Sequence, residues 1–171
     1  MQGGFTGTLN QLEAYLAEGA AARTIVISRL FDAPRELVWK VMTTPEHMVH
    51  THTPAGWTTF FDEVDLRPGG NCRWRMRTPD GQEMHMHFVY REVVPFERIV
   101  HTEARQEGNP YKPGSTGILT FEAKGGKTLL TLRFVFGTVA DRERLAQMGF
   151  AGPIAQSLEL AAVYIAKLQG G

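Results

Sequence analysis

The sequence has little cysteine and no excess of charge. Cys72 is the single cysteine among 171 residues, which excludes an intramolecular disulfide and a multi-cysteine metal site. Eighteen basic residues balance eighteen acidic ones, so no net field attracts a polyanion. We therefore expect no nucleic-acid partner. The lone thiol is compatible with a reducing compartment.

Long apolar runs are also missing. No stretch approaches the about 20 apolar residues that a membrane-spanning helix needs. The first ten residues lack the basic start and apolar centre of a secretion signal. These absences predict a cytoplasmic protein without membrane insertion. Hydrophobic residues at 43% and charged residues at 21% are ordinary values for a chain that folds around its own core.

The order of local patterns predicts an α+β fold. Residues 24–31 alternate as a strand, and short helices are expected at 34–42, with Asp32 as N-cap, and from Thr44-Pro45 through Met48. Residues 58–136 have six strand patterns separated by short turns. After Gly137 one apolar stripe marks a long helix, formed by Ile154, Leu158, Ala161, Ala162, Ile165 and Leu168. We expect a curved antiparallel sheet of six to seven strands packed on this C-terminal helix.

The chain divides into a short extension and one domain. Residues 1–22 are an N-terminal extension in which Leu9, Leu12, Tyr15 and Leu16 recur at the spacing of a short helix. The apolar side of that helix needs a partner, so we expect it to pack on its own domain or on a second copy. We expect the domain itself to span residues 23–169 and the protein to be a monomer or a homodimer.

Strand alternation predicts an apolar concave face. Six side chains of two neighbouring strands share one face: Trp74, Met76, Met84, Met86, Phe88 and Tyr90. The opposite face carries Arg73, Arg75, Arg77, His85 and His87, which fits a solvated surface. One helix is about 10 Å wide and cannot fill a concave sheet of six or seven strands. The remaining space is therefore predicted to be an apolar pocket.

A series of short motifs is similar to a known family. The motifs are Phe31-Asp32-Ala33-Pro34 with Val38-Trp39, Thr44-Pro45-Glu46-His47-Met48, Asp65-Leu66-Arg67-Pro68-Gly69-Gly70, Pro79-Asp80-Gly81, Val93-Val94-Pro95 with Glu97-Arg98, Gly126-Lys127-Thr128, and Ser157-Leu158. In this order they resemble the START-like (SRPBCC) helix-grip superfamily, and within it the branch named for the activator of the heat-shock-protein-90 ATPase homologue. The resemblance runs from about residue 24 to about residue 168. It implies the helix-grip fold and an interior cavity, but no particular ligand.

Two departures from the family pattern concern the mouth of that cavity. Where the family usually carries Trp-Trp-Gly-Pro, this chain has Thr51-His52-Thr53-Pro54. Where a Gly-Trp pair usually opens the last helix, it has Pro153-Ile154. Smaller or more polar groups thus replace three bulky aromatics. This predicts a wider or more polar opening.

The leading functional hypothesis is binding of a small apolar or amphipathic ligand, with no cofactor and no metal. The wall is expected to consist of Trp74, Met76, Met84, Met86, Phe88, Tyr90, Phe121 and Leu158, with His52, Trp57, His101 and Ile154 near the openings. An alternative is a cyclase- or hydrolase-type enzyme in which His101 works with Glu103 or Tyr90 as acid and base. His101 and Glu103 could also form the exposed end of an edge strand. A third alternative, suggested by the family name, is an interaction module that stimulates a chaperone ATPase.

Two His-x-His pairs invite a metal-site hypothesis. His85 and His87 fall on the strand face opposite the apolar row, so they are expected to point outward. His50 and His52 lie in a loop. Carboxylate or cysteine partners at ligand spacing are missing from both pairs, and we predict no metal site.

Overall fold

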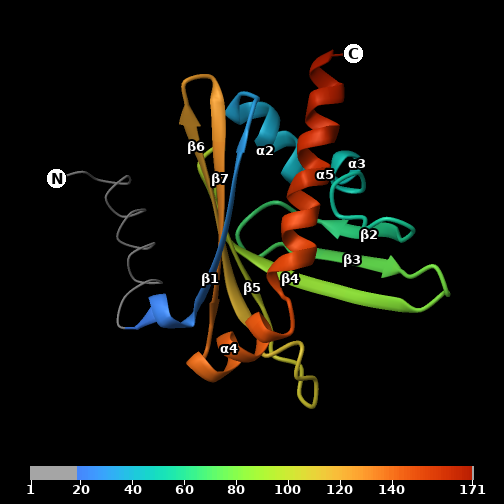
Figure 1. Cartoon of the computed structure of the whole chain (residues 1–171), viewed down its shortest axis with the longest axis vertical. Helices are drawn as coiled ribbons and strands as arrows, with labels where there is room; N and C mark the ends of the chain where they lie inside the picture. The colour runs from blue at the N-terminus through green and yellow to red at the C-terminus, as the bar shows by residue number, and fades with distance from the viewer. Residues whose placement is uncertain (1–18, 171) are drawn as a thin grey trace.

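The computed structural model describes residues 19–170, and its centre is one antiparallel sheet (Figure 1). The sheet has seven strands in the order β1-β7-β6-β5-β4-β3-β2. Their bounds are β1 Thr24–Phe31, β2 Thr58–Val64, β3 Asn71–Arg77, β4 Glu83–Val94, β5 Arg98–Glu103, β6 Ser115–Lys124 and β7 Lys127–Phe136. The crossover from β1 to β2 carries two short helices, as the sequence predicts.

Within residues 19–170, five helical segments accompany the sheet: the 3-10 helix η1 Ala20–Arg23, α2 Arg35–Thr43, α3 Pro45–Met48, α4 Val139–Gln147 and α5 Ala151–Gly170. The predicted α+β architecture, with a curved antiparallel sheet and a long C-terminal helix, is confirmed. The expected N-cap of α2 is wrong. Pro34 is the N-cap residue in extended conformation, and no side chain caps the helix. The separate helix α4 was not predicted.

Three strands form a wing that reaches beyond the C-terminal helix. In Figure 1, β2, β3 and β4 extend to the right past α5, whereas β1, β5, β6 and β7 run nearly vertically. Register shifts lie between Phe61 and Glu63 in β2 and between Tyr90 and Glu92 in β4. Bulges of this kind bend a strand and increase its twist. The wing therefore curves away from the rest of the sheet.

The main core lies between the sheet and the helices α2 and α5. Helix α5 makes its main contacts with β1 and α2. The buried side chains there include Phe31, Val38, Val41, Leu130, Leu158, Ala161 and Ile165. Helix α5 thus covers the end of the sheet at β1 and leaves the wing with less cover.

A smaller apolar cluster lies on the opposite face of the sheet. Ala20 of η1 is fully buried there beside Val100, Ile118 and Val135. The predicted helix around residues 9–16 lies outside the described residues. Within residues 19–170, none of the helices combines the length and the apolar character needed to cross a membrane.

Candidate ligand-binding face

A row of aromatic rings crosses the concave face of the wing. Phe61 of β2 pairs with Trp74 of β3, and their stacked rings lie 5.8 Å apart between centroids. Trp74 meets Phe88 of β4 edge-on at 5.4 Å, and Phe88 meets Tyr90 edge-on at 5.2 Å. Alternation along each strand puts these rings on one face, because every second residue points the same way.

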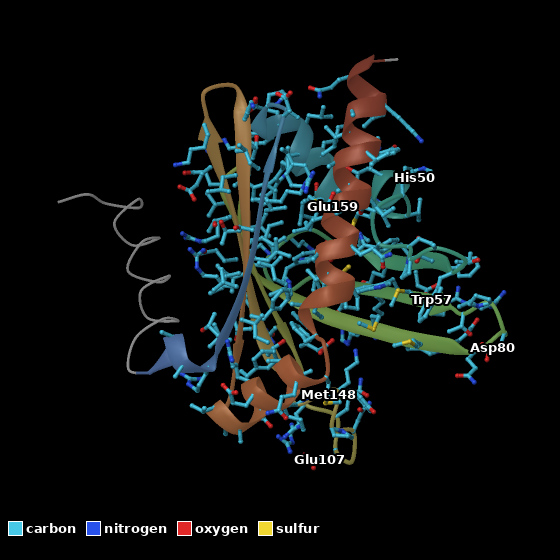
Figure 2. All side chains as sticks on the ribbon, in the orientation of Figure 1. His50, Trp57, Asp80, Glu107, Met148 and Glu159 are labelled. Atoms are coloured by element: carbon cyan, nitrogen blue, oxygen red, sulfur yellow. The ribbon has the colours of Figure 1, made fainter. Side chains whose placement is uncertain are left out.

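Much of this face remains partly exposed to solvent. Helix α5 covers β1 and α2 instead, and Figure 2 shows the wing side chains beside α5, with Trp57 toward the end of the wing. The half-buried predicted residues are His52, Trp57, Trp74, Met76, Met86, Phe88, His101 and Ile154. Met84 is 43% exposed. These residues leave apolar surface available for a ligand.

Three other predicted wall residues are fully inside the core. Phe121 lies under α2, with its ring edge-on to Trp39 at 5.1 Å. Tyr90 and Leu158 are also buried. Burial raises the pKa of Tyr90 and raises that of its hydrogen-bond partner Cys72 to about 11, so both groups stay neutral. Phe121 and Leu158 support the fold behind the aromatic row, and Tyr90 is the buried end of that row.

His101 lies flat on the sheet between an aromatic ring and a glycine. Its imidazole stacks on Phe88 with 3.9 Å between ring centroids. A Cβ on Gly117, its register partner on β6, would lie 2.3 Å from His101 Cε1. The Nδ1 atom is buried and has no hydrogen-bond partner among the described residues. Loss of hydration lowers the pKa of His101 to about 4, so the ring is neutral at pH 7.

His52 also points inward from the loop after α3. Its ring is edge-on to Phe61 at 5.7 Å and to Trp74 at 6.3 Å. Its Nδ1 lies 2.7 Å from Thr51 Oγ1, and burial lowers the pKa of His52 to about 4. Ser157 of α5 donates a hydrogen bond to the Thr51 carbonyl at 2.6 Å. This bond joins the loop that contains Thr51 and His52 to α5.

Glu103 and Lys112 form an ion pair at the end of the aromatic row. Lys112 Nζ lies 3.2 Å from Glu103 Oε2 and 3.2 Å from Met86 Sδ. The side chains are 13% exposed for Lys112 and 22% exposed for Glu103. Within the part of the chain that the structure describes, His101 makes no hydrogen bond to Glu103 or Tyr90. The geometry of an acid–base pair is therefore not formed there.

The histidine pairs do not converge on a metal site. His50 stacks on Tyr164 of α5 at 4.6 Å, whereas His52 points to the aromatic row. His85 and His87 are exposed. Residues 19–170 contain no group of three or more histidine, cysteine, aspartate or glutamate side chains placed to hold a metal ion.

The outer face of β3 is a charged surface whose three arginines are paired. Arg75 lies 2.9 Å from Asp62, Arg77 lies 2.7 Å from Glu83, and Arg73 lies 3.2 Å from Glu63. Each arginine therefore has a carboxylate neighbour on the same surface. The row is a solvated sheet face and not an unpaired anion-binding surface.

Two hollows lie beside the strands β4 to β7. The larger one, of about 460 Å³, includes Arg23, Thr102, Thr116 and Val135 in its lining. The smaller one, of about 120 Å³, lies along β4 and β5 and includes Phe88 and Glu103. No residue of α5 lines either hollow. An interior cavity between sheet and α5 thus stays a prediction.

The model of one protein family matches most of the chain. Its description is Activator of Hsp90 ATPase homolog 1-like protein, and the match covers residues 32–165. The chain belongs to this family. The residues that match include the sheet from β2 to β7, the wing and most of α5.

Solved structures share the fold of this family member. A protein from Nitrosomonas europaea is 23% identical, with a TM-score of 0.76 over 88% of this chain and 99% of that one. A protein from Arthrobacter aurescens is 17% identical, with a TM-score of 0.78 over 88% of this chain and 90% of that one. None of the curated proteins matches the chain. At such identities the structural likeness concerns the fold.

Sequence reasoning missed three residues of this face. The register shift directly after Phe61 interrupts the alternation of inward and outward residues in β2, which hides the orientation of Phe61 in the sequence. Its spacing of two residues from Thr59 nevertheless indicates that both side chains share one face. Gly117 gains its role only by lying opposite His101. Lys112 comes from the loop between β5 and β6, and no sequence pattern places a loop lysine beside Met86.

Proposed function

We propose that this member of the family binds a small apolar or amphipathic molecule on the concave face of the wing, beside α5. The observation that carries the proposal is the partly exposed row of apolar side chains, which α5 leaves uncovered. Contiguous apolar surface of this kind is costly in water and commonly marks a binding site. Methionines at its rim adapt to ligands of different shape.

The alternatives have less support. An acid–base mechanism needs a hydrogen-bonded pair, and Glu103 is bound to Lys112 instead of His101. Stimulation of a chaperone ATPase rests on the description of the family alone. Ligand binding is the function that the residues of the wing support best.

A neutral fluorescent probe, N-phenylnaphthylamine, tests the proposal. Its emission rises in an apolar site, and we expect saturable binding to the full-length protein. Met84→Glu places a charge on the concave face and should weaken binding about tenfold or more, because a carboxylate is costly to desolvate. His85→Glu is the matched control, since its exposed side chain points to the opposite face of the same strand.

Two results would contradict the proposal. One is the absence of saturable probe binding to the folded parent protein. The other is equal weakening by both variants, which would show that the probe does not distinguish the two faces. Native mass spectrometry of the freshly purified protein then measures the mass of any molecule that it retains.

A further inference from the structure

The concave face of the wing has almost no charge. On β2, β3 and β4 the inward positions are apolar or neutral, and the two nearby imidazoles of His52 and His101 are neutral as well. On β5 the inward residues are Ile99, His101 and Glu103. Glu103 is therefore the one charged residue at the inward positions of these four strands, which all lie within the described chain.

Lys112 cancels this charge from outside the sheet. The loop between β5 and β6 carries its ammonium group to 3.2 Å from Glu103 Oε2, against Met86 of the aromatic and methionine-lined face. Both side chains are largely withdrawn from solvent. Removing one partner of such a pair leaves the other as an uncompensated charge in a poorly hydrated place. The intact pair presents no free cation to a ligand.

We propose that Glu103, by neutralising Lys112, determines the charge selectivity of this face, so that it accepts uncharged apolar molecules and rejects anionic ones of the same shape. The inference rests on the proposed binding function. Glu103 is a specificity-determining residue that acts through Lys112. Among the apolar and amphipathic molecules that the proposed function allows, the expected ligands are therefore those without a charge.

A matched pair of probes tests this selectivity. N-phenylnaphthylamine and anilinonaphthalene sulfonate share one ring system and differ by a sulfonate. We expect the parent protein to prefer the neutral probe. Glu103→Gln keeps the size of the side chain and removes its charge, so the affinity for the sulfonate probe should rise about fivefold or more. That gain should shrink at high ionic strength, because salt screens the freed ammonium group.

Two variants separate selectivity from general effects. Glu103→Gln combined with Lys112→Gln has no freed cation, so its preference should return to that of the parent. Glu63→Gln frees Arg73 on the outer face of the wing and should leave the preference unchanged. If Glu103→Gln does not fold, Lys112→Gln gives the mirror test. Its unpaired carboxylate should then favour displacement of the neutral probe by dodecyltrimethylammonium.

The outcomes distinguish this inference from the binding function. A parent protein that binds neither probe contradicts both. A parent that binds the two probes equally, or a folded Glu103→Gln variant with the parental preference, overturns only the selectivity inference. If dodecyltrimethylammonium displaces the neutral probe from Lys112→Gln no more readily than from the parent protein, the selectivity inference is overturned as well.

Discussion

His101 and Gly117 occupy opposite positions on β5 and β6, and the glycine gives the imidazole its space. A Cβ at residue 117 would overlap the ring, which Phe88 holds from its other face. We expect Gly117→Ala to lower the free energy of unfolding by about 1 to 3 kcal/mol, the usual cost of overpacking. Urea denaturation measures the change.

Gly137→Ala is the control for this substitution. No heavy atom lies within 4 Å of the Cβ that it would add, and the change should stay within about 0.5 kcal/mol. His101→Ala should relieve the effect of Gly117→Ala in the double variant. If the losses of unfolding free energy in the two single variants simply add in the double variant, the His101 ring does not overlap with a side chain at residue 117.

The two inward imidazoles make stability depend on pH. His52 and His101 have pKa values of about 4 in the folded chain, against an ordinary value of 6.5. Below pH 6.5 the unfolded chain binds protons that the native state does not bind, so stability falls as the pH falls from about 6.5 to about 4. Each ring contributes at most about 1.4 kcal/mol per pH unit.

Urea unfolding measured between pH 4 and pH 8 checks this dependence. His101→Phe retains an aromatic ring beside Phe88 and removes one titrating group, so its stability should vary less steeply with pH. A variant as steep as the parent would show that His101 does not contribute to the slope.

Helix α4 is the helix that local sequence patterns did not predict. Its nine residues bury Asp141 and Leu145 and have no continuous apolar stripe. The helix depends instead on local polar contacts. Thr138 is the N-cap residue, and its Oγ1 accepts a hydrogen bond from the Asp141 amide at 3.0 Å.

Removal of this cap should destabilise the protein measurably. We expect Thr138→Ala to cost about 1 kcal/mol of unfolding free energy, because the Asp141 amide loses its acceptor. Thr138→Ser retains the hydroxyl and should behave like the parent in thermal denaturation. An equal loss in both variants would point to the methyl group of the threonine and not to the cap.

The 3-10 helix η1 packs the start of the described chain against the face of the sheet opposite α5. Ala20 is fully buried beside Val100 and Ile118, and its carbonyl accepts a hydrogen bond from Thr24. Removal of residues 1–22 should expose this cluster. We expect a lower melting temperature or a changed oligomer size in size-exclusion chromatography, because the extension is predicted to pack on its own domain or on a second copy.

A pair of point variants makes the same test without truncation. Ala20→Asp places a carboxylate in the apolar cluster and should destabilise the fold, whereas Ala21→Asp lies at an exposed position. If truncation leaves both melting temperature and size unchanged, the extension is a passive tail and its predicted role is wrong.

Apart from η1 and α4, the order and type of the elements between residues 19 and 170 were determined by the sequence. Strand alternation and turn residues are local, so they identified the first strand, the six strands after it and the long last helix. The same alternation put Trp74, Met86 and Phe88 on one face, and in the structure they share it. Charge and cysteine content further limited the classes of partner.

Contacts between distant residues were decided only by the tertiary structure. The curvature of the sheet and the position of α5 over β1 and α2 determine which apolar side chains remain exposed to solvent. Tyr90, Phe121 and Leu158 are buried in the core, whereas Met84 is exposed. The pairing of Glu103 with Lys112, and not with His101, depends on the path of a loop. Local sequence patterns do not specify contacts between distant residues, because burial and pairing depend on how the sheet, the helices and the loops pack together.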